Sequence, residues 1–279
     1  MKKNKKTSVN KNKQTVHFIN SYLLNPTNPI SVNLIGIGGT GSSMLMALAR
    51  INKSLITLRH AGLHVVAYDA DKVEEPNLGR QLFTEAELGL NKAVASINRV
   101  NRGFGFNWKA VPENFISSSD MASITITCVD NVTSRLQVAD CFSKNRYNHY
   151  HYSSRQYWMD CGNDKETGQV LLSTIGEHDQ PQSEKYHVQG SLPLITDEYG
   201  ILLRESEMKS TTPSCSLAEA LEQQDLFINT NIANIGASLI WKMFRKGMIK
   251  NRGFFINLED FRMQPIKINA PTGKKTCKY

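Results

Sequence analysis

The segment VNLIGIGGTGSS, residues 32–43, constrains the fold of this chain more than any other. A short apolar run ends in a cluster of glycines, and apolar residues at helical spacing follow in residues 42–51. A strand, a glycine turn and a helix in this order present backbone N–H groups and the positive end of a helix dipole, about half an elementary charge, to an anion. We therefore predict a phosphate-binding loop made by four glycines: Gly36, Gly38, Gly39 and Gly41.

Further strands and helices alternate after the glycine loop. Residues 63–69 and 124–129 have the composition of buried strands, and helices are predicted over residues 84–101, opened by a capping box at Thr84, and over about 132–145. This alternation predicts an α/β fold with a Rossmann-like, mostly parallel sheet and helices on both faces. Ligands of such sheets bind at the carboxyl ends of the strands.

The second half of the chain follows a different pattern. Apolar runs separated by polar turns predict that antiparallel strands are added to the sheet in the C-terminal half, at residues 157–161, 168–175, 253–258 and 264–269. Residues 177–213 form a long polar passage, which we interpret as a crossover loop, and residues 216–246 have apolar side chains at helical spacing. The apolar helix is a plausible surface for dimerisation.

The chain is long enough for one substantial core, since it has 279 residues of which 40% are hydrophobic. We predict a single domain over residues 15–279, with its nucleotide-binding part at residues 30–146. The five cysteines include no C-x-x-C pair, so no zinc site is expected, and their scatter suits a reducing compartment. No apolar run of 18 residues occurs. We expect a cytoplasmic protein without membrane contact.

The formal net charge of +8 is concentrated at the two ends of the chain. Residues 1–13 hold six lysines and residues 274–279 hold three, with no acidic residue in either segment. Subtracting these nine from 33 basic residues leaves 24, against 25 acidic residues, so the body carries a formal charge of −1. We predict that residues 1–14 are a disordered basic tail, which either contacts nucleic acid weakly or only favours solubility.

The glycine loop alone does not identify the nucleotide. An oxidoreductase that binds NAD or flavin needs the spacing of Gly36, Gly38 and Gly41 and an acidic residue downstream, such as Asp69. That interpretation leaves several polar segments unexplained. They are DADKVEEPNLGRQLF at residues 69–83, GLNK at 89–92, and CVDN at 128–131 with Arg135 beyond it.

Together these segments resemble the adenylation family of ThiF, MoeB and the ubiquitin-activating enzymes. The pattern of that family is a G-x-G-G-x-G loop, then D-x-D-x-V, N-L-x-R-Q, a later G-x-x-K, and D-N with a trailing arginine, and it matches residues 30–135. Less specifically, PSCSLAEA at residues 213–220 is similar to a P-T-C segment of the family. Segments such as WMDCGND and PSCSLAEALEQQDLFIN resemble the ThiF-related member of plasmid-borne PRTRC cassettes.

The resemblance implies an enzyme that uses ATP and Mg²⁺ to adenylate the C-terminal carboxylate of a small ubiquitin-like protein, releasing pyrophosphate, and that works as a homodimer. A carboxylate and a triphosphate repel each other, so such a site must concentrate positive charge. The resemblance assigns this task to Arg80 and Lys92, while Asp130 would hold Mg²⁺. The other implied nucleotide contacts come from the glycine loop and from Asp69, which would bind the ribose, Asp71, Asn77, Asn131 and Arg135, the last as a support for Asp130.

Two features leave alternatives open. Cys215 lies where some members of the family carry a nucleophilic cysteine, but it could equally pack inside the protein while its serine neighbours cap a helix. The family commonly takes an arginine from the N-terminal segment of a partner subunit, yet residues 14–30 contain neither arginine nor lysine. A nucleotide-binding adaptor with little catalytic activity is therefore a second hypothesis.

Overall fold

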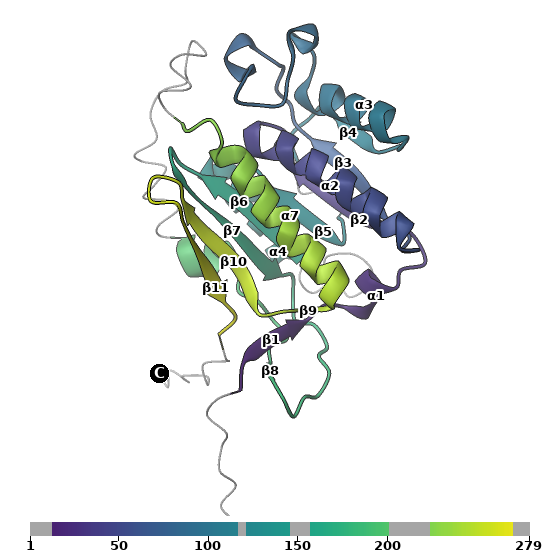
Figure 1. Cartoon of the computed structure of the whole chain (residues 1–279), viewed down its shortest axis with the longest axis vertical. Helices are drawn as coiled ribbons and strands as arrows, with labels where there is room; N and C mark the ends of the chain where they lie inside the picture. The colour runs from purple at the N-terminus through teal and green to yellow at the C-terminus, as the bar shows by residue number, and fades with distance from the viewer. Residues whose placement is uncertain (1–12, 117–120, 146–156, 201–223, 270–279) are drawn as a thin grey trace, which may run out of the picture.

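The computed structural model describes residues 13–116, 121–145, 157–200 and 224–269. Its centre is a mixed eight-stranded sheet with the strand order β11-β10-β7-β6-β5-β2-β3-β4 (Figure 1). Strands β6, β5, β2, β3 and β4 are parallel, and β7, β10 and β11 follow β6 with each strand antiparallel to the one before it, as predicted. The bounds are β2 (Ile30–Ile35), β3 (Leu63–Tyr68), β4 (Lys109–Val111), β5 (Ile124–Thr127), β6 (Tyr157–Asn163), β7 (Thr167–Thr174), β10 (Asn251–Asn257) and β11 (Arg262–Lys267).

Helices cover the two faces of this sheet because its strands are apolar on both sides. Figure 1 shows α2 (Gly39–Thr57) and α7 (Ile228–Lys246) side by side on one face, with α3 (Lys92–Phe104) next to α2. Leu34 of β2 belongs to the core on that face, whereas its neighbour Ile35 packs in the second core with α4 (Val132–Asn145). The predicted α/β class with helices on both faces is thus confirmed.

Two tryptophans are fixed inside these cores. The indole Nε1 of Trp158 in β6 donates to Thr127 Oγ1 at 2.9 Å, and Trp158 is fully buried. Trp108, just before β4, is also buried, and its Nε1 donates to the carbonyl oxygen of Leu63 at 3.0 Å. Each indole therefore satisfies its single donor within the sheet.

A second, small sheet lies at the opposite end of the main sheet from the glycine loop (Figure 1). It consists of β1 (Thr15–Phe18), β8 (His187–Val188) and β9 (Met248–Ile249), and the short helix α1 (Ser21–Leu24) follows β1. His17 connects it to the start of β6, because its Nδ1 donates to the carbonyl oxygen of Gln189 at 2.7 Å and its Nε2 accepts from the hydroxyl of Tyr157 at 2.8 Å.

The predicted helix over residues 84–101 is wrong at its start. Thr84 and Glu87 do form a capping box, but it closes only the 3₁₀ turn Glu85–Glu87, and α3 begins at Lys92 with Asn91 as its N-cap. Between them Gly89 has a φ of 79°, in the left-handed region that no helix continues through. One helix is therefore replaced by a turn and a helix.

The predicted helix over residues 216–246 is also corrected within the described residues. Helix α7 begins at Ile228, and residues 216–223 lie outside the described parts of the chain. The backbone N–H of Phe227 donates to Asp225 Oδ1 at 2.8 Å, a local turn that precedes the helix. None of the helices in the described ranges is long and apolar enough to cross a membrane.

The first part of the predicted crossover loop is attached to the sheet. Residues 195–200 are helical up to the point where the description stops, and residues 201–213 lie outside it. Buried Arg252 of β10 forms an ion pair with Glu198 and donates to the carbonyl oxygen of Pro193 at 3.2 Å. This polar passage thus has a fixed position on the sheet at least as far as Glu198.

Candidate nucleotide-binding site

A cavity of about 670 Å³ lies at the carboxyl ends of β2, β3 and β5. This is the edge at which ligands of parallel sheets bind. The structure brings many of the predicted site residues to it. Those that line the cavity are Gly36, Gly38, Gly39, Asp69, Asp71, Arg80, Lys92, Asp130 and Asn131.

The glycines of the loop differ in what surrounds them. Gly36 has a φ of 84°, and a Cβ there would lie 2.9 Å from the carbonyl oxygen of Cys128. A Cβ on Gly41, which does not line the cavity, would collide with the carbonyl oxygen of Gly36. At Gly38, by contrast, a Cβ would meet only Nε2 of Gln81, at 4.0 Å, among the described residues. Gly36 and Gly41 are thus required by the fold, and the space in front of Gly38 belongs to the cavity.

Helix α2 begins at this loop. Its N-cap is Gly38, so no cap side chain accepts from the first amide groups of the helix. The residues that line the cavity include Gly38, Gly39 and Thr40 of the first turn. The N-terminus of a 19-residue helix therefore lies at the cavity with amide donors suited to an anion.

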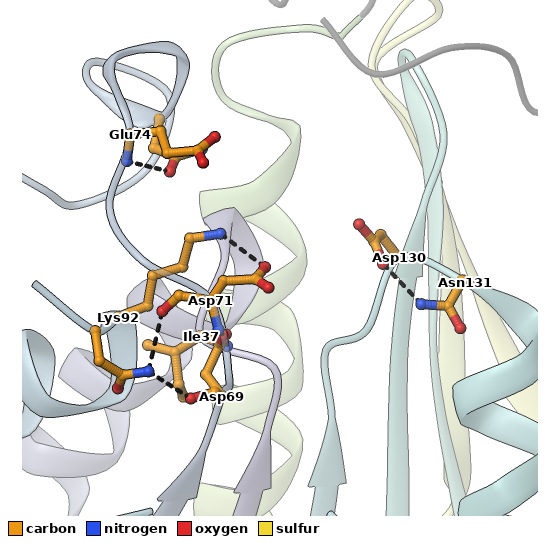
Figure 2. A network of polar contacts seen from close by, with 9 residues as sticks. Ile37, Asp69, Asp71, Glu74, Lys92, Asp130 and Asn131 are labelled. Carbon is orange, nitrogen blue, oxygen red and sulfur yellow. Dashed lines mark hydrogen bonds and ion pairs between the residues drawn. The ribbon is translucent and has the colours of Figure 1, made fainter. Parts of the chain in front are cut away.

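Asp69, directly after β3, holds the glycine loop in place. Its Oδ2 accepts from the N–H of Ile37 at 2.6 Å, and its Oδ1 accepts from the N–H of Asp71 at 2.8 Å (Figure 2). Burial raises the pKa of Asp69 above its ordinary value, and these two N–H donors oppose the rise. Each carboxylate oxygen retains a second lone pair for a further donor.

Lys92 lies beside Asp69, at the start of α3. Its Nζ is 3.1 Å from Asp71 Oδ2, and the Lys92 side chain is 10% exposed while that of Asp71 is 72% exposed (Figure 2). The Nδ2 of Asn91 donates to the carbonyl oxygens of Asp69 and Asp71, which fixes the start of α3 against the end of β3. A pair with one exposed partner is weak, so the ammonium group can exchange Asp71 for a stronger anion.

Arg80 is the second cation at the cavity. Its Nε donates to the carbonyl oxygen of Pro76 at 3.2 Å, and its Nη1 donates to Oε1 of Gln224 at 3.3 Å. Partial burial lowers the pKa of Arg80, and the charge of Asp130 opposes this effect. Because a guanidinium stays protonated in proteins, Arg80 contributes a permanent positive charge.

Asp130 and Asn131 approach the cavity from another side, at the end of β5 (Figure 2). Asp130 is exposed, and its Oδ1 accepts from Nδ2 of Asn131 at 3.1 Å. Asn131 Oδ1 accepts from the N–H of Ser134 at 2.7 Å, so Asn131 also caps α4. The described residues contain no group of three or more histidine, cysteine or acidic side chains that would hold a metal by themselves.

Two predicted site residues have other contacts. Arg135 was expected to support Asp130, but its Nε donates to Asp160 Oδ1 at 3.0 Å, and both side chains are buried. That expectation is wrong, because a buried cation is stabilised best by the nearest buried anion. Asn77 does not line the cavity; its Oδ1 accepts from the N–H of Glu74 at 2.9 Å and caps the 3₁₀ turn Glu75–Asn77. Cys215 lies outside the described residues.

The sequence reasoning missed several polar side chains that line the cavity. Gln81 is 8% exposed, and its Oε1 is buried without a partner among the described residues. Gln81 directly follows Arg80 in the NLGRQ segment, so the motif that predicted Arg80 could also have predicted Gln81. Thr40, Gln224 and Asn229 are three more of them, and nothing in the sequence pattern of α7 marked Asn229.

The fold and the site define an α/β protein with a glycine loop at the carboxyl edge of a parallel sheet, faced by two cations and three carboxylates. The chain belongs to the ThiF family, which it matches over residues 16–278. The resemblance predicted from the motifs is therefore confirmed at the level of the family. The similarity to PRTRC cassette proteins stays a prediction.

The relatives agree with this assignment. The chain is similar to the protein named ubiquitin-like modifier-activating enzyme 5 in Arabidopsis thaliana, with 29% identity over 171 residues, 53% of this chain and 36% of the relative. The protein of that name in Drosophila erecta is 30% identical over 134 residues, 41% of this chain and 31% of the relative. In each comparison the match spans about a third of the curated relative.

Solved structures share the fold at low sequence identity. Escherichia coli MccB crystallised with ATP has a TM-score of 0.56 and 15% identity, and the match covers 92% of this chain and 68% of MccB. PaaA has a TM-score of 0.54 and 15% identity, covering 86% of this chain and 64% of PaaA. These similarities show the fold alone.

Proposed function

We propose that this protein is an ATP-dependent adenylating enzyme that activates the C-terminal carboxylate of a small ubiquitin-like protein. The proposal rests on one observation: three kinds of group line the same cavity. They are a glycine loop with open space in front of Gly38, the cations Arg80 and Lys92, and the carboxylate of Asp130. Support comes from relatives whose name describes activation of a ubiquitin-like modifier and from MccB, a structural neighbour crystallised with ATP and with MccA.

The cavity suits a nucleoside triphosphate. A Cβ at Gly38 would fill the open space in front of the loop, and the buried Oε1 of Gln81 lacks a partner among the described residues, so an amide at this point is available to a ligand. Arg80 and Lys92 supply positive charge for phosphate oxygens. Asp69, held by two backbone N–H groups, has lone pairs left for ribose hydroxyls. ATP would supply the adenylyl group and the pyrophosphate leaving group.

Asp130 fits a role in holding Mg²⁺ together with the nucleotide. It is a single exposed carboxylate, and Mg²⁺ binds through one or two carboxylates with phosphate oxygens and waters rather than in a cage of protein ligands. Asn131 orients it through the 3.1 Å hydrogen bond. The residues at the cavity would thus bind the nucleotide, neutralise its charge and exclude water around an incoming carboxylate.

A catalytically weak nucleotide-binding adaptor is the second candidate. It is favoured by the lack of arginine and lysine in residues 14–30, because the family commonly brings an arginine from that segment of a partner subunit. A homodimer, the role of Cys215 and a contact between the lysine tail and nucleic acid also stay proposals. An NAD-dependent or flavin-dependent oxidoreductase is disfavoured, since it gives no role to Arg80 and Lys92 at the same cavity.

The decisive measurement is ATP–pyrophosphate exchange with Mg²⁺ and small proteins that end in Gly-Gly or a similar tail. We expect exchange that depends on one of these proteins and on Mg²⁺. Calorimetry with ATP and NAD in parallel should show tighter binding of ATP. Tighter binding of NAD would overturn the proposal, and ATP binding without exchange for any candidate would favour the adaptor.

A further inference from the structure

A chain of four hydrogen-bonded side chains runs from Arg80 to Thr40, in the first turn of α2. Nη1 of Arg80 donates to Gln224 Oε1 at 3.3 Å, and the same oxygen accepts from Nδ2 of Asn229 at 2.9 Å. Oδ1 of Asn229 in turn accepts from the hydroxyl of Thr40 at 2.9 Å. All four residues line the cavity, and Asn229 and Thr40 are each only 4% exposed.

The polarity of this chain of hydrogen bonds is set by Arg80. A guanidinium only donates, so Gln224 must turn its amide oxygen toward Arg80. That oxygen then also accepts from the amide nitrogen of Asn229, which leaves the Asn229 oxygen for the Thr40 hydroxyl. Each amide therefore has one orientation in which every contact joins a donor to an acceptor.

Asn229 also explains why residue 39 of the GIGGTG loop is a glycine. A Cβ at Gly39 would lie 2.6 Å from both Cγ and Nδ2 of Asn229 and 2.8 Å from its Oδ1. The amide of Asn229 thus occupies the space beside Gly39. The absent side chain at Gly39 makes room for α7, whereas the absent side chain at Gly38 opens the cavity.

We propose that Asn229 is a positioning residue which, through Gln224 and Thr40, fixes the Arg80 guanidinium relative to the glycine loop. This inference rests on the proposed ATP site and adds a contribution from α7, an element outside the nucleotide-binding part predicted from the sequence. The Arg80 segment and the start of α2 also meet directly, because the N–H of Leu82 donates to Ser42 Oγ at 3.3 Å. That contact fixes the backbone, whereas the chain through Gln224 and Asn229 reaches the guanidinium itself. Preorganised donors of this kind bind a phosphate group without the cost of being ordered first.

The test compares the full chain with Asn229→Ala, Thr40→Val and Thr40→Ser. The first readout is the Nη–H resonances of the Arg80 guanidinium, the group that donates to Gln224, in nitrogen-15 NMR spectra of the free protein, assigned with Arg80→Lys. We expect faster hydrogen exchange at this group in Asn229→Ala. The second readout is the Kd for ATP with Mg²⁺, which should rise roughly tenfold in Asn229→Ala and Thr40→Val, the effect of losing one hydrogen bond, while Thr40→Ser keeps most of the affinity.

Asn231→Ala is the matched control. Asn231 is the same residue type on the same helix, its Nδ2 donates to the carbonyl oxygen of Phe227 at 3.1 Å, and it does not line the cavity. Its variant should leave both the Arg80 resonance and the ATP affinity unchanged.

If Asn229→Ala leaves the Arg80 resonance as it is in the wild type, the positioning role is overturned. This holds whatever the pyrophosphate-exchange assay shows. An equal loss of ATP affinity in Asn229→Ala and Asn231→Ala overturns it too. A wild-type protein that supports no pyrophosphate exchange argues instead against the proposed function, so the two failures are distinguishable.

Discussion

At the scale of single residues, two glycines of the same loop differ sharply in how much room they have. A Cβ at Gly41 would collide with the backbone of Gly36, while a Cβ at Gly38 would face the cavity. We expect Gly41→Ala to lower the melting temperature, because backbone must move, and Gly38→Ala to leave it unchanged but to weaken ATP binding, because the methyl group takes space that a phosphate needs. Thermal melts and calorimetry on both variants check this. Equal effects on stability and affinity in the two would contradict it.

Substitutions of Lys92 and of Asp130 should affect pyrophosphate exchange in different ways. If Lys92 stabilises charge that develops toward pyrophosphate, Lys92→Ala slows exchange by roughly 10² to 10³ and weakens ATP binding less. Asp130→Ala should reduce exchange strongly and also change its Mg²⁺ dependence, because the carboxylate acts through the ion.

Exchange rates and ATP affinities across a Mg²⁺ titration measure both effects, after circular dichroism has confirmed folding. Lys109→Ala, at an exposed position on the edge strand β4, is the control for loss of a lysine and should behave as the wild type. Near-wild-type exchange in Lys92→Ala and Asp130→Ala would mean that neither residue acts in the reaction.

The sequence predicted the site residues that belong to a motif or follow a strand end. It did not predict contacts between residues that no motif connects. Asp69, Arg80 and Asp130 follow strand ends or a recognised motif, so their arrival at one edge was predictable. Arg135 lies on α4, and its partner Asp160 lies 25 residues away on strand β6. The contribution of Asn229 was equally hidden, since it depends on how α7 packs against α2.

At the scale of elements, His17 attaches β1 to the main sheet and makes this attachment sensitive to acid. Burial lowers the pKa of His17 below its ordinary value of 6.5, and the carbonyl of Gln189 opposes this. As the pH falls through 6.5 the unfolded chain takes up a proton before the folded chain does, so stability falls with pH. We expect a lower free energy of unfolding at pH 5.5 than at pH 7.5.

His17→Gln is the informative variant, because glutamine can donate to Gln189 and accept from Tyr157 but does not titrate. Urea unfolding at the two pH values should show a smaller pH dependence for this variant than for the wild type. The same pH dependence in both proteins would exclude His17 as its source.

The longer strands and α4 were predictable because their patterns extend over several residues. Strands β1, β4, β8 and β9, of two to four residues, were not, since such short segments show no period and, unlike the equally short β5, they do not lie in a longer β-branched run such as ITITCV. The start of α3 was missed for another reason. The capping box at Thr84 is real, but it caps a 3₁₀ turn, and the non-helical backbone of Leu88, Gly89 and Asn91 separates that turn from the helix.

At the scale of the whole molecule, the excess positive charge belongs to the two end segments of the sequence. Residues 1–12 lie outside the described structure, and the first strand begins at Thr15. We expect deletion of residues 1–12 to leave the melting temperature unchanged, since the lysine-rich segment has little to bury. If the tail binds DNA, the deletion also reduces the salt dependence of binding. A drop of several degrees in the melting temperature would show that the domain begins earlier than residue 15.

The positions of the tryptophans make the molecule a fluorescent indicator of its own folding. Trp108 and Trp158 are buried with their indole nitrogens bonded, and Trp241 lies under the guanidinium of Arg245. None of the three is among the residues that line the cavity. Their emission should therefore shift to longer wavelength when the chain unfolds and stay constant when ATP binds. A ribose-labelled nucleotide would then report binding at a second wavelength in the same cuvette, so that loss of a ligand and loss of the fold could be told apart in one titration.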